Sequence, residues 1–237
     1  MSKRILLKIS GESIGDKTNN ETLNTNKLEQ IASLIKEITL KDFEVAIVIG
    51  AGNIWRGKLA SKLGIDSADA DYMGMTGTVI NAVALTAAIK NQGLKAECMS
   101  AIHIPPITLP FDEEEAKKLL SEKNVLVFGG GTGKPFFTTD TAATLRAIQI
   151  DADEILMAKY GVDGVYSADP NLYENATFFE KLTFSEVLDK GLQAMDLSAI
   201  QLIKDKDICI RVFNMDDPKN IIKVVNGEKI GTIISKR

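Results

Sequence analysis

The amino-acid sequence predicts an α/β fold in which a mostly parallel central sheet has helices on each side. Short apolar runs without polar alternation recur along the chain, for example at residues 5–9 and 45–49. Segments with apolar residues at helical spacing lie between these runs. Strands that are apolar throughout are buried on both faces, which is typical of parallel sheets between two layers of helices.

The first half of the chain is predicted to contain three strands and three helices. The strands are expected at residues 5–9, 45–49 and 95–99. The first helix is expected to begin at Asn26, because Glu29 follows three residues later as in a capping box. The other helices are expected at residues 75–92 and from residue 112 to about residue 123.

The second half continues the same alternation. Further strands are expected at residues 125–128, 154–157, 208–213 and 229–235. Helices are expected at residues 138–149, 184–190 and 197–206. The polar stretches 16–26 and 163–181 are the best candidates for long mobile loops. Because neither a repeat nor a low-complexity linker is evident, we expect a single domain over residues 1–237.

Composition excludes several kinds of chemistry. The chain has one histidine, His103, so a metal site built from several histidines is impossible. Its two cysteines, Cys98 and Cys209, are far apart in the sequence, which fits neither a zinc ribbon nor a dithiol pair. This cysteine usage favours a reducing, cytoplasmic compartment.

Charge and hydropathy give the chain no obvious affinity for large anionic partners. The formal net charge is −4, without a block of Lys and Arg, so we expect neither nucleic-acid nor membrane-surface binding. We expect no signal peptide, because only three apolar residues follow Arg4 before Lys8. We also expect no membrane-spanning helix, because no apolar run approaches 18 residues.

Three predicted strands end in segments suited to phosphate. Lys8 to Gly11 closes the first strand, Gly50 to Asn53 the second, and Gly129 to Gly133 precedes a helix. Glycines let backbone N–H groups approach an anion, and a helix N-terminus adds a favourable dipole. Lys159 would supply a second positive charge after the strand at 154–157.

Familiar nucleotide-binding motifs do not describe these loops. Gly133-Lys134 lacks both the preceding glycine and the following Ser or Thr of a Walker A motif, and no G-x-G-x-x-G follows a strand. Any single loop could be an ordinary tight turn, and Asp140 could simply cap a helix. Trp55 is expected to pack in the core. Three such loops on one sheet edge are more persuasive together, and phosphoryl transfer needs mainly positioning and charge neutralisation.

Seven segments in order resemble the bacterial uridylate kinases of the amino acid kinase superfamily. They are KISGE (8–12), IGAGNIWRG (49–57), DYMGM (71–75), GTGKPFFTTD (131–140), VDGVYSADP (162–170), MDL (195–197) and IRVFNM (210–215). The resemblance covers the chain from residue 4 onward, and the stretch at residues 133–140 is very specific within the superfamily.

The resemblance implies a three-layer α/β/α sandwich with the UMP-binding part mainly N-terminal and the ATP-binding part mainly C-terminal. It implies a transferase, a nucleoside monophosphate kinase that makes UDP and ADP from UMP and ATP in pyrimidine nucleotide biosynthesis. It further implies dependence on Mg²⁺ carried by ATP rather than on a fixed protein metal site. Inhibition by UTP, a cytoplasmic location and a homohexamer are implied as well.

Carried over position by position, the resemblance also implies site residues. Those expected to bind ATP are Lys8, Ile9, Ser10, Gly11, Gly52, Arg56, Tyr160, Tyr166 and Asp169. Those expected to bind UMP are Ala51, Asp71, Thr132, Gly133, Lys134, Pro135, Phe136, Phe137, Thr138 and Thr139. Lys8 and Lys159 would stabilise the transferred phosphate, while Asp140 would orient them or help hold Mg²⁺. Asp196 would be a supporting acid.

The chain departs from the family pattern at two places. Ala51 stands where a third glycine is usual, and alanine fits there if its φ is negative. The glycine-rich segment that often follows Glu12, and that is tied to GTP activation in many members, is not matched at residues 13–17. The resemblance therefore does not extend to activation by GTP.

Two alternative functions use the same residues. A kinase on the same fold could act on an amino acid carboxylate or on carbamate, and Asp71 together with residues 132–139 argues for UMP instead. A nucleotide-binding regulator without catalysis is the second alternative. It would have no need of the charged set Lys8, Arg56 and Asp140.

Overall fold

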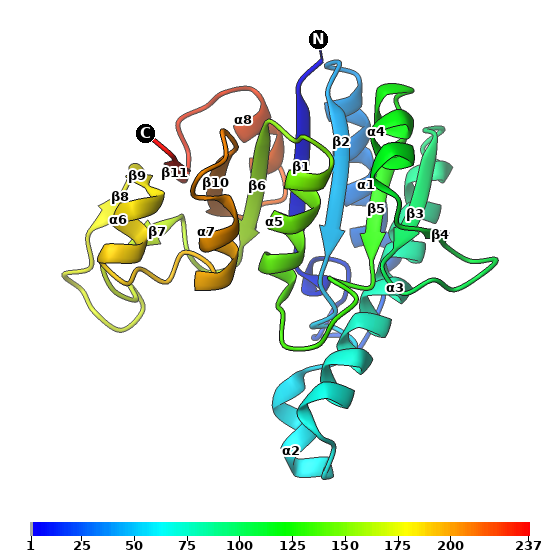
Figure 1. Ribbon diagram of the computed structural model, residues 1–237, viewed down its shortest axis with the longest axis horizontal. Helices are drawn as coiled ribbons and strands as arrows, with labels where there is room; N and C mark the ends of the chain where they lie inside the picture. The colour runs from blue at the N-terminus through cyan, green and yellow to red at the C-terminus, as the bar shows by residue number, and fades with distance from the viewer. Residues whose placement is uncertain (1) are drawn as a thin grey trace.

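A computed structural model describes residues 2–237 and has the predicted three layers (Figure 1). Within these residues, nine strands form one sheet in the order β4-β3-β5-β2-β1-β6-β10-β11-β9. All neighbouring strands are parallel except β10 and β11, which are antiparallel. The α/β fold class and the mostly parallel sheet are confirmed.

The strand bounds agree closely with the apolar runs of the sequence. The sheet consists of β1 (Arg4–Ile9), β2 (Glu44–Ile49), β3 (Ala96–Ser100), β4 (Leu109–Pro110), β5 (Val125–Gly129), β6 (Glu154–Lys159), β9 (Lys181–Thr183), β10 (Cys209–Asn214) and β11 (Thr232–Ser235). The short strands β4 and β9 carry too few residues to show a pattern and were not predicted.

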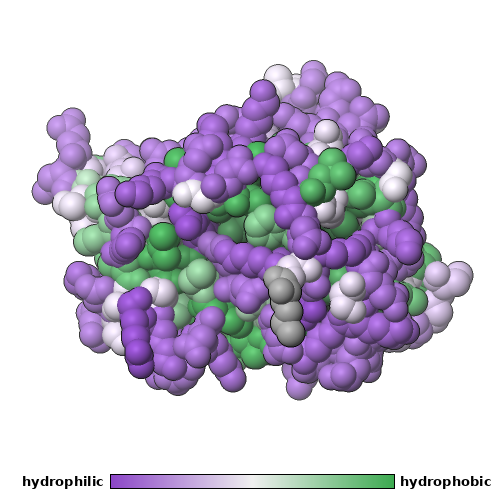
Figure 2. Space-filling view, turned by 90° about the horizontal axis from the view of Figure 1, so that it is seen from above, coloured by the Kyte–Doolittle hydropathy of each residue, from purple (hydrophilic) through white to green (hydrophobic). Residues whose placement is uncertain are grey.

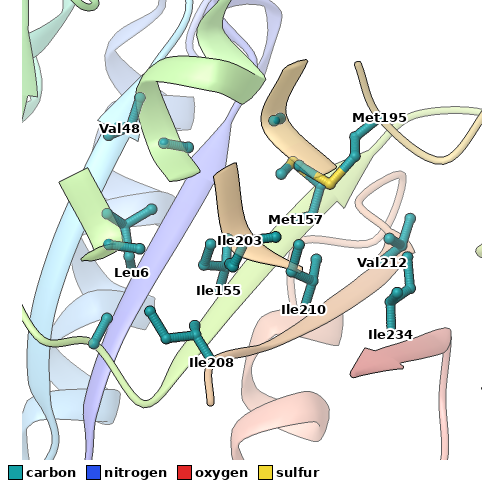
Figure 3. Packing of buried hydrophobic residues seen from close by; sticks show 14 of the residues in the cluster. Leu6, Val48, Ile155, Met157, Met195, Ile203, Ile208, Ile210, Val212 and Ile234 are labelled. Atoms are coloured by element: carbon teal, nitrogen blue, oxygen red, sulfur yellow. The ribbon is translucent and has the colours of Figure 1, made fainter. Parts of the chain in front are cut away.

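Successive residues of each central strand serve two separate cores. Leu6, Ile155 and Ile210 point to one face of the sheet (Figure 3), whereas Leu7 and Ile47 belong to the core on the other face. This division follows from the two-residue period of a strand. Both cores are apolar, which is why the strands show no polar alternation in the sequence.

Each face of the sheet is covered by its own helices. The core that contains Leu7 takes in residues of α1 (Thr25–Thr39), α3 (Ser67–Asn91) and α8 (Asn220–Val225). The core that contains Leu6 takes in residues of α4 (Glu113–Ser121), α5 (Thr139–Gln149), α6 (Phe184–Asp189) and α7 (Leu197–Ile203).

Two helix starts differ from their predictions. The N-cap of α1 is Asn24, whose side chain accepts a hydrogen bond from the Lys27 N–H at 2.9 Å, so the predicted capping box at Asn26 is wrong. Helix α3 begins at Ser67, eight residues before its predicted start, with Asp66 as N-cap. Gly74 and Gly77 weaken the helical pattern in its first turns, and the packing of these turns compensates.

Helix α3 is also the one described helix long and apolar enough to pass for a membrane span, with a mean hydropathy of 1.4 over its most apolar stretch. Half of that stretch is buried inside the domain, where it contacts β3, β5 and α1. These contacts are those of a core helix, and its length and composition are weak evidence for a membrane.

The two polar stretches adopt local structure. Asp16 and Glu21 form an isolated antiparallel bridge within residues 16–26. The second stretch contains β7 (Val165–Tyr166) and β8 (Phe178–Phe179), which pair with each other as a small separate sheet.

The short helix α2 (Ala60–Leu63) precedes α3 and projects from the edge of the molecule at which the central parallel strands end (Figure 1). The opposite edge presents mainly hydrophilic residues to solvent (Figure 2).

Candidate functional site

The candidate site lies where four neighbouring strands end. Strands β5, β2, β1 and β6 are adjacent in the sheet and parallel, so their carboxyl ends share one edge. The segments after them are the predicted glycine loops and Lys159, and in Figure 1 this edge faces downward toward α2. Ligands of open α/β sheets bind at this kind of edge.

A carboxylate joined to two lysines forms the centre of this edge. Asp140, in the first turn of α5, accepts from the Lys8 Nζ at 2.7 Å through one oxygen. Its other oxygen accepts from the Lys159 Nζ at 3.0 Å. Lys8 comes from β1 and Lys159 from β6, so three elements meet at one carboxyl group. The predicted grouping of Lys8, Asp140 and Lys159 is therefore present.

Burial and charge act in opposite directions on Asp140. Burial favours the neutral acid, but the positive charges of Lys8 and Lys159 outweigh it and hold the pKa of Asp140 below its usual range. The carboxylate therefore stays ionised at neutral pH and fixes both ammonium groups. This supports the predicted orienting role of Asp140.

The start of α5 connects Asp140 to a second acidic group. Thr138 is the N-cap, and its hydroxyl accepts from the Thr141 N–H at 3.3 Å. The same hydroxyl donates to the Asp196 carboxylate, at the N-cap of α7. Asp196 thus holds the N-cap residue of α5, the helix whose first turn contains Asp140, in keeping with a supporting role.

The loops after β1 and β2 pack against each other so tightly at Gly11 that no side chain fits there. A Cβ on Gly11 would come within 2.2 Å of the Asn53 Oδ1 and 2.5 Å of the Gly50 carbonyl oxygen. The Gly50 N–H donates to the Ile9 carbonyl at 3.0 Å, and the Ile9 side chain is wholly buried. Ile9 therefore supports the loop from below, and its predicted contact with ATP stays a prediction.

Ala51 and Ser10 fit this loop geometry. The described non-glycine residues with positive φ do not include Ala51, so the alanine that replaces a family glycine is unstrained. Ser10 is the N-cap of a short 3-10 helix, residues Gly11–Ser13, and its hydroxyl accepts from the Glu12 N–H at 3.3 Å. Both loops follow strands that end at the same edge of the sheet as Lys8 and Lys159.

Arg56 is engaged by an acidic neighbour. Its guanidinium forms an ion pair with Glu12 and also donates to the Gly52 carbonyl at 3.3 Å. Glu12 accepts in addition from the Lys17 Nζ at 2.9 Å. Arg56 is more than half exposed, so it can exchange Glu12 for an anionic ligand at small cost.

A cavity of about 470 Å³ opens beside the loops after β2 and β5. Its walls include many of the residues predicted for UMP, namely Ala51, Asp71, Phe136, Phe137, Thr138 and Thr139. Asp71 lies in the second turn of α3, and one of its oxygens accepts from the Phe136 N–H at 2.7 Å. Its other oxygen remains available to a hydroxyl group of a ligand.

Residues 132–135 do not line this cavity. The Thr132 hydroxyl donates to the Lys134 carbonyl at 3.0 Å, which closes a tight turn, and the Lys134 side chain is exposed. Thr132, Gly133, Lys134 and Pro135 thus shape the loop that carries Phe136. A direct contact of these four residues with UMP stays a prediction.

Sequence reasoning missed several walls of the cavity. Trp55, expected in the core, lines it instead and donates its indole N–H to the Ala70 carbonyl at 2.8 Å. Further walls are Gly57, Gly74, Met75, Thr78 and Gly131. Gly74 lies in the part of α3 before residue 75, which the sequence pattern did not identify as helical, whereas Met75 and Thr78 lie in the predicted helix but were given no place in the site.

A buried arginine supports the same wall and was also missed. Arg146, in α5, lies with its guanidinium carbon 3.7 Å from the centre of the Phe111 ring. It donates to the Gly131 carbonyl at 3.3 Å. Burial lowers the pKa of Arg146 to about 10, so the side chain is still cationic at neutral pH. In the sequence, Arg146 cannot be told apart from an ordinary exposed arginine of a helix.

A second cavity, of about 510 Å³, is formed by the segment that follows β6 together with residues 191–193. Tyr166 and Asp169, both predicted for ATP, line it. The Tyr166 ring meets Phe178 edge to face, with centroids 5.2 Å apart. Tyr160 is partly exposed near the end of β6 and is not among the lining residues. Because β1 and β6 lie between the segments that form the two cavities, the lysine pair stands between them in the fold.

The donor set suits a metal ion that arrives with phosphate. No group of three or more His, Cys, Asp or Glu side chains within residues 2–237 is arranged to hold a metal. Asp140 is already paired with two lysines. Mg²⁺ commonly binds through one or two carboxylates and the substrate phosphates, and Asp140 is the acidic group placed to contribute.

The thiol groups are remote from this chemistry. Cys98 is buried in β3, and burial raises the pKa of its thiol to about 11. Burial also raises the pKa of Cys209, in β10. Both thiols are therefore protonated at neutral pH and poor nucleophiles.

The fold and the site define a family. The profile of the amino acid kinase family matches residues 3–214, and the chain belongs to this family. Among solved structures, a UMP kinase from Ureaplasma parvum is 38% identical, with a TM-score of 0.94 and 100% of both chains covered. A UMP kinase from Bacillus anthracis is 38% identical with a TM-score of 0.94, and the match covers 99% of this chain and 96% of that chain.

A more distant relative shares the whole architecture. A uridylate kinase from Archaeoglobus fulgidus is 29% identical with a TM-score of 0.73, and the match covers 98% of this chain and 99% of that chain. The chain is therefore similar over its whole length to kinases of uridylate from bacteria and an archaeon.

The lowered pKa of Asp140 predicts how stability depends on pH. Replacing Asp140→Asn leaves two lysines without their carboxylate and should lower the free energy of unfolding at pH 7 by about 3 kcal/mol. Because the folded pKa is depressed, this contribution is complete above the unfolded pKa of about 3.9 and is lost as pH falls through the folded value. Urea unfolding between pH 7 and pH 3 measures it.

The exposed Asp189→Asn provides the control, with an expected change within about 0.5 kcal/mol throughout. A gap between wild type and Asp140→Asn that stays constant down to pH 3 would contradict the ion-paired Asp140.

Proposed function

We propose that the protein is a UMP kinase that transfers the γ-phosphate of ATP to UMP and releases UDP and ADP. The observation that carries the proposal is the Asp140-bridged pair of Lys8 and Lys159. It lies at the strand-end edge, where one ligand-sized cavity opens beside the loops after β2 and β5 and another lies in the segment after β6. The 38% identity to two UMP kinases over nearly the full chain supports uridylate as the acceptor.

The chemistry requires no general base. An oxygen of the UMP phosphate is already ionised and attacks the γ-phosphorus, while the bond to the β–γ bridging oxygen breaks and its electrons remain on ADP. Lys8 and Lys159 neutralise charge on the phosphoryl group in flight, and the N–H groups after β1 and β2 hold its oxygens. Mg²⁺ bound to ATP supplies further charge neutralisation. The one histidine, His103, lies exposed in a loop away from the walls of both cavities.

The cavity beside α3 is the proposed uridylate site. Asp71 offers a carboxylate oxygen to ribose hydroxyls, and Phe137 and Trp55 supply apolar walls for the base. The Ala51 N–H is proposed to bind the phosphate of UMP, whereas Arg56, which is not among the walls of this cavity, is proposed to bind the ATP phosphates. The second cavity, with Tyr166 and Asp169, is the proposed site for the adenosine part of ATP.

Finer expectations rest on the family resemblance and are proposed with it. UTP shares the uridine group with UMP and is proposed to inhibit by occupying the same cavity. The protein is proposed to act in pyrimidine nucleotide synthesis in the cytoplasm. A homohexamer is proposed, and the exposed Tyr72, Met73 and Ile80 of α3 supply apolar surface that assembly could cover.

A substrate panel tests the acceptor. Purified protein with Mg²⁺ and ATP should release ADP with UMP and give much lower rates with aspartate, glutamate or carbamate. The cavity beside α3 has Asp71 pointing at the ligand space, which repels a second carboxylate and accepts from sugar hydroxyls. Turnover with a carboxylate or carbamate but not with UMP would refute the uridylate assignment.

Lys8→Ala tests catalysis against simple binding. We expect kcat to fall by about 10² to 10⁴, because half of the preorganised positive charge at the reacting phosphate is lost. The affinity for UMP, measured by calorimetry, should stay within about threefold, because Lys8 is absent from the walls of the proposed UMP cavity. The exposed Lys118→Ala is the control. Tight binding of both nucleotides by wild type without UDP formation would instead indicate a regulator.

Asp71→Asn tests the ribose contact. Asparagine keeps the size of the side chain and can still accept from the Phe136 N–H, but it lacks the negative charge that strengthens a hydrogen bond from a hydroxyl group. We expect KM for UMP to rise about tenfold and KM for ATP to stay unchanged. Asp69→Asn, on the exposed first turn of the same helix, is the matched control. Equal KM values for the two variants would contradict the ribose contact.

A further inference from the structure

Two buried polar side chains of α3 reach two different loops of the site. Thr78 and Asn81 lie three residues apart on the inner face of the helix, and both are buried. Thr78 belongs to the turn that follows Asp71, and Asn81 lies one turn further. Thr78 forms part of the wall of the proposed uridylate cavity, and Asn81 does not line it. The bonds that their side chains make to the loops are not used in the phosphoryl transfer described above.

Thr78 is bonded to the loop after β5. Its hydroxyl accepts from the Gly130 N–H at 2.8 Å and donates to the Met75 carbonyl of its own helix at 2.6 Å. Gly130 has a φ of +74°, and a Cβ there would come within 2.6 Å of the Ser100 Oγ. The loop can therefore hold this shape only with glycine, and Thr78 satisfies the N–H that this shape buries.

Asn81 is bonded to the loop after β2. Its side-chain N–H₂ group donates to the Gly50 carbonyl at 2.7 Å and to the Asn53 Oδ1 at 2.8 Å. Asn53 in turn donates to the Thr22 carbonyl at 2.8 Å. The side chain of Asn81 is fully buried, so these bonds compete with no solvent.

Close packing brings α3 and the loop after β2 together. A Cβ on Gly77 would lie 3.0 Å from the Ala51 Cβ, which is tighter than an ordinary contact. Glycine at this position allows the backbone of the helix to approach the loop, and that approach places Asn81 within reach of Gly50. Residues 77, 78 and 81 thus lie on one face of α3 and contact the two loops from it.

We propose that Thr78 and Asn81 are positioning residues, through which one helix sets the relative placement of two loops. These are residues 130–138 after β5, here called the uridylate loop, and residues 50–53 after β2, here called the phosphate loop. The proposal rests on the proposed function for its kinetic consequences. Asp71 is carried by the same helix, so the ribose contact, the uridylate loop and the phosphate loop share one rigid support. Displacement of either loop by about an ångström is enough to reduce turnover strongly.

Thr78→Val tests the link to the uridylate loop. Valine keeps the shape of threonine but leaves the Gly130 N–H buried without a partner. We expect KM for UMP to rise about tenfold while KM for ATP stays within twofold. Thr78→Ser should restore the wild-type value, because it returns the hydroxyl group.

The same helix provides a matched control. Thr86 is also buried, but its hydroxyl donates only to the Ala82 carbonyl of its own helix, at 2.7 Å. Thr86→Val therefore repeats the chemical change without touching a loop. We expect it to leave both KM values unchanged. A rise in KM for UMP that is equal in Thr86→Val and Thr78→Val would overturn the proposal.

Asn81→Leu tests the second loop. It removes the hydrogen bonds to Gly50 and Asn53 together. In the proposed function, the loop after β2 that contains these two residues binds the phosphates of both UMP and ATP. We expect kcat/KM to fall by about tenfold or more for UMP and ATP alike. Melting temperatures of all variants identify any that do not fold. An Asn81→Leu variant that folds and keeps wild-type kcat/KM would overturn the role of Asn81.

Amide hydrogen exchange separates this proposal from the proposed function. The Gly130 amide should exchange at least tenfold faster in Thr78→Val than in Thr86→Val, whatever the substrate of the enzyme. Equal exchange in these two variants would overturn the positioning role. Absence of UMP turnover in wild type would refute the proposed function alone, and the exchange measurement would still decide the positioning role.

Discussion

The interaction on which the site depends is the ion pairing of Asp140 with Lys8 and Lys159. Two ammonium groups this close repel one another unless a carboxylate lies between them, and burial strengthens both effects. Asp140 can lie between the two lysines because it is in the first turn of α5. That helix begins next to Asp140 because Thr138 is its N-cap. The three residues come from β1, α5 and β6, so the charge cluster exists only where the sheet brings these elements together.

The long helix α3 is the second element that the site requires. It carries Asp71 to one cavity, forms much of that cavity's wall and contacts the loops after β2 and β5. Arg146 supports the β5 loop from the opposite face of the sheet, through α5. The loop is therefore held from both helix layers. Glycine-rich loops have little intrinsic rigidity, and such external bonds reduce their freedom before a substrate arrives.

The sequence predicted the central strands and the lysine pair well, because fully apolar strands and a lysine at a strand end are strong local signals. It placed the start of α3 eight residues too late, since Gly74 weakens the helical pattern just before residue 75 and its packing against Trp55 is not visible in the sequence. It assigned Trp55 to the core and gave no role to Thr78, Asn81 or Arg146. Their roles follow from tertiary contacts with loops that are distant in the sequence, and a one-dimensional pattern contains no trace of them.

The most direct test of the central claim follows the phosphoryl group itself. Protein is incubated with Mg²⁺, UMP and ATP labelled at the γ-phosphorus, and the products are separated. The account predicts that the label appears in the β-phosphate of UDP, in equal amount to the ADP formed, without free phosphate. Label recovered only as inorganic phosphate, or none transferred at all, would contradict a site built to pass phosphate between two nucleotides.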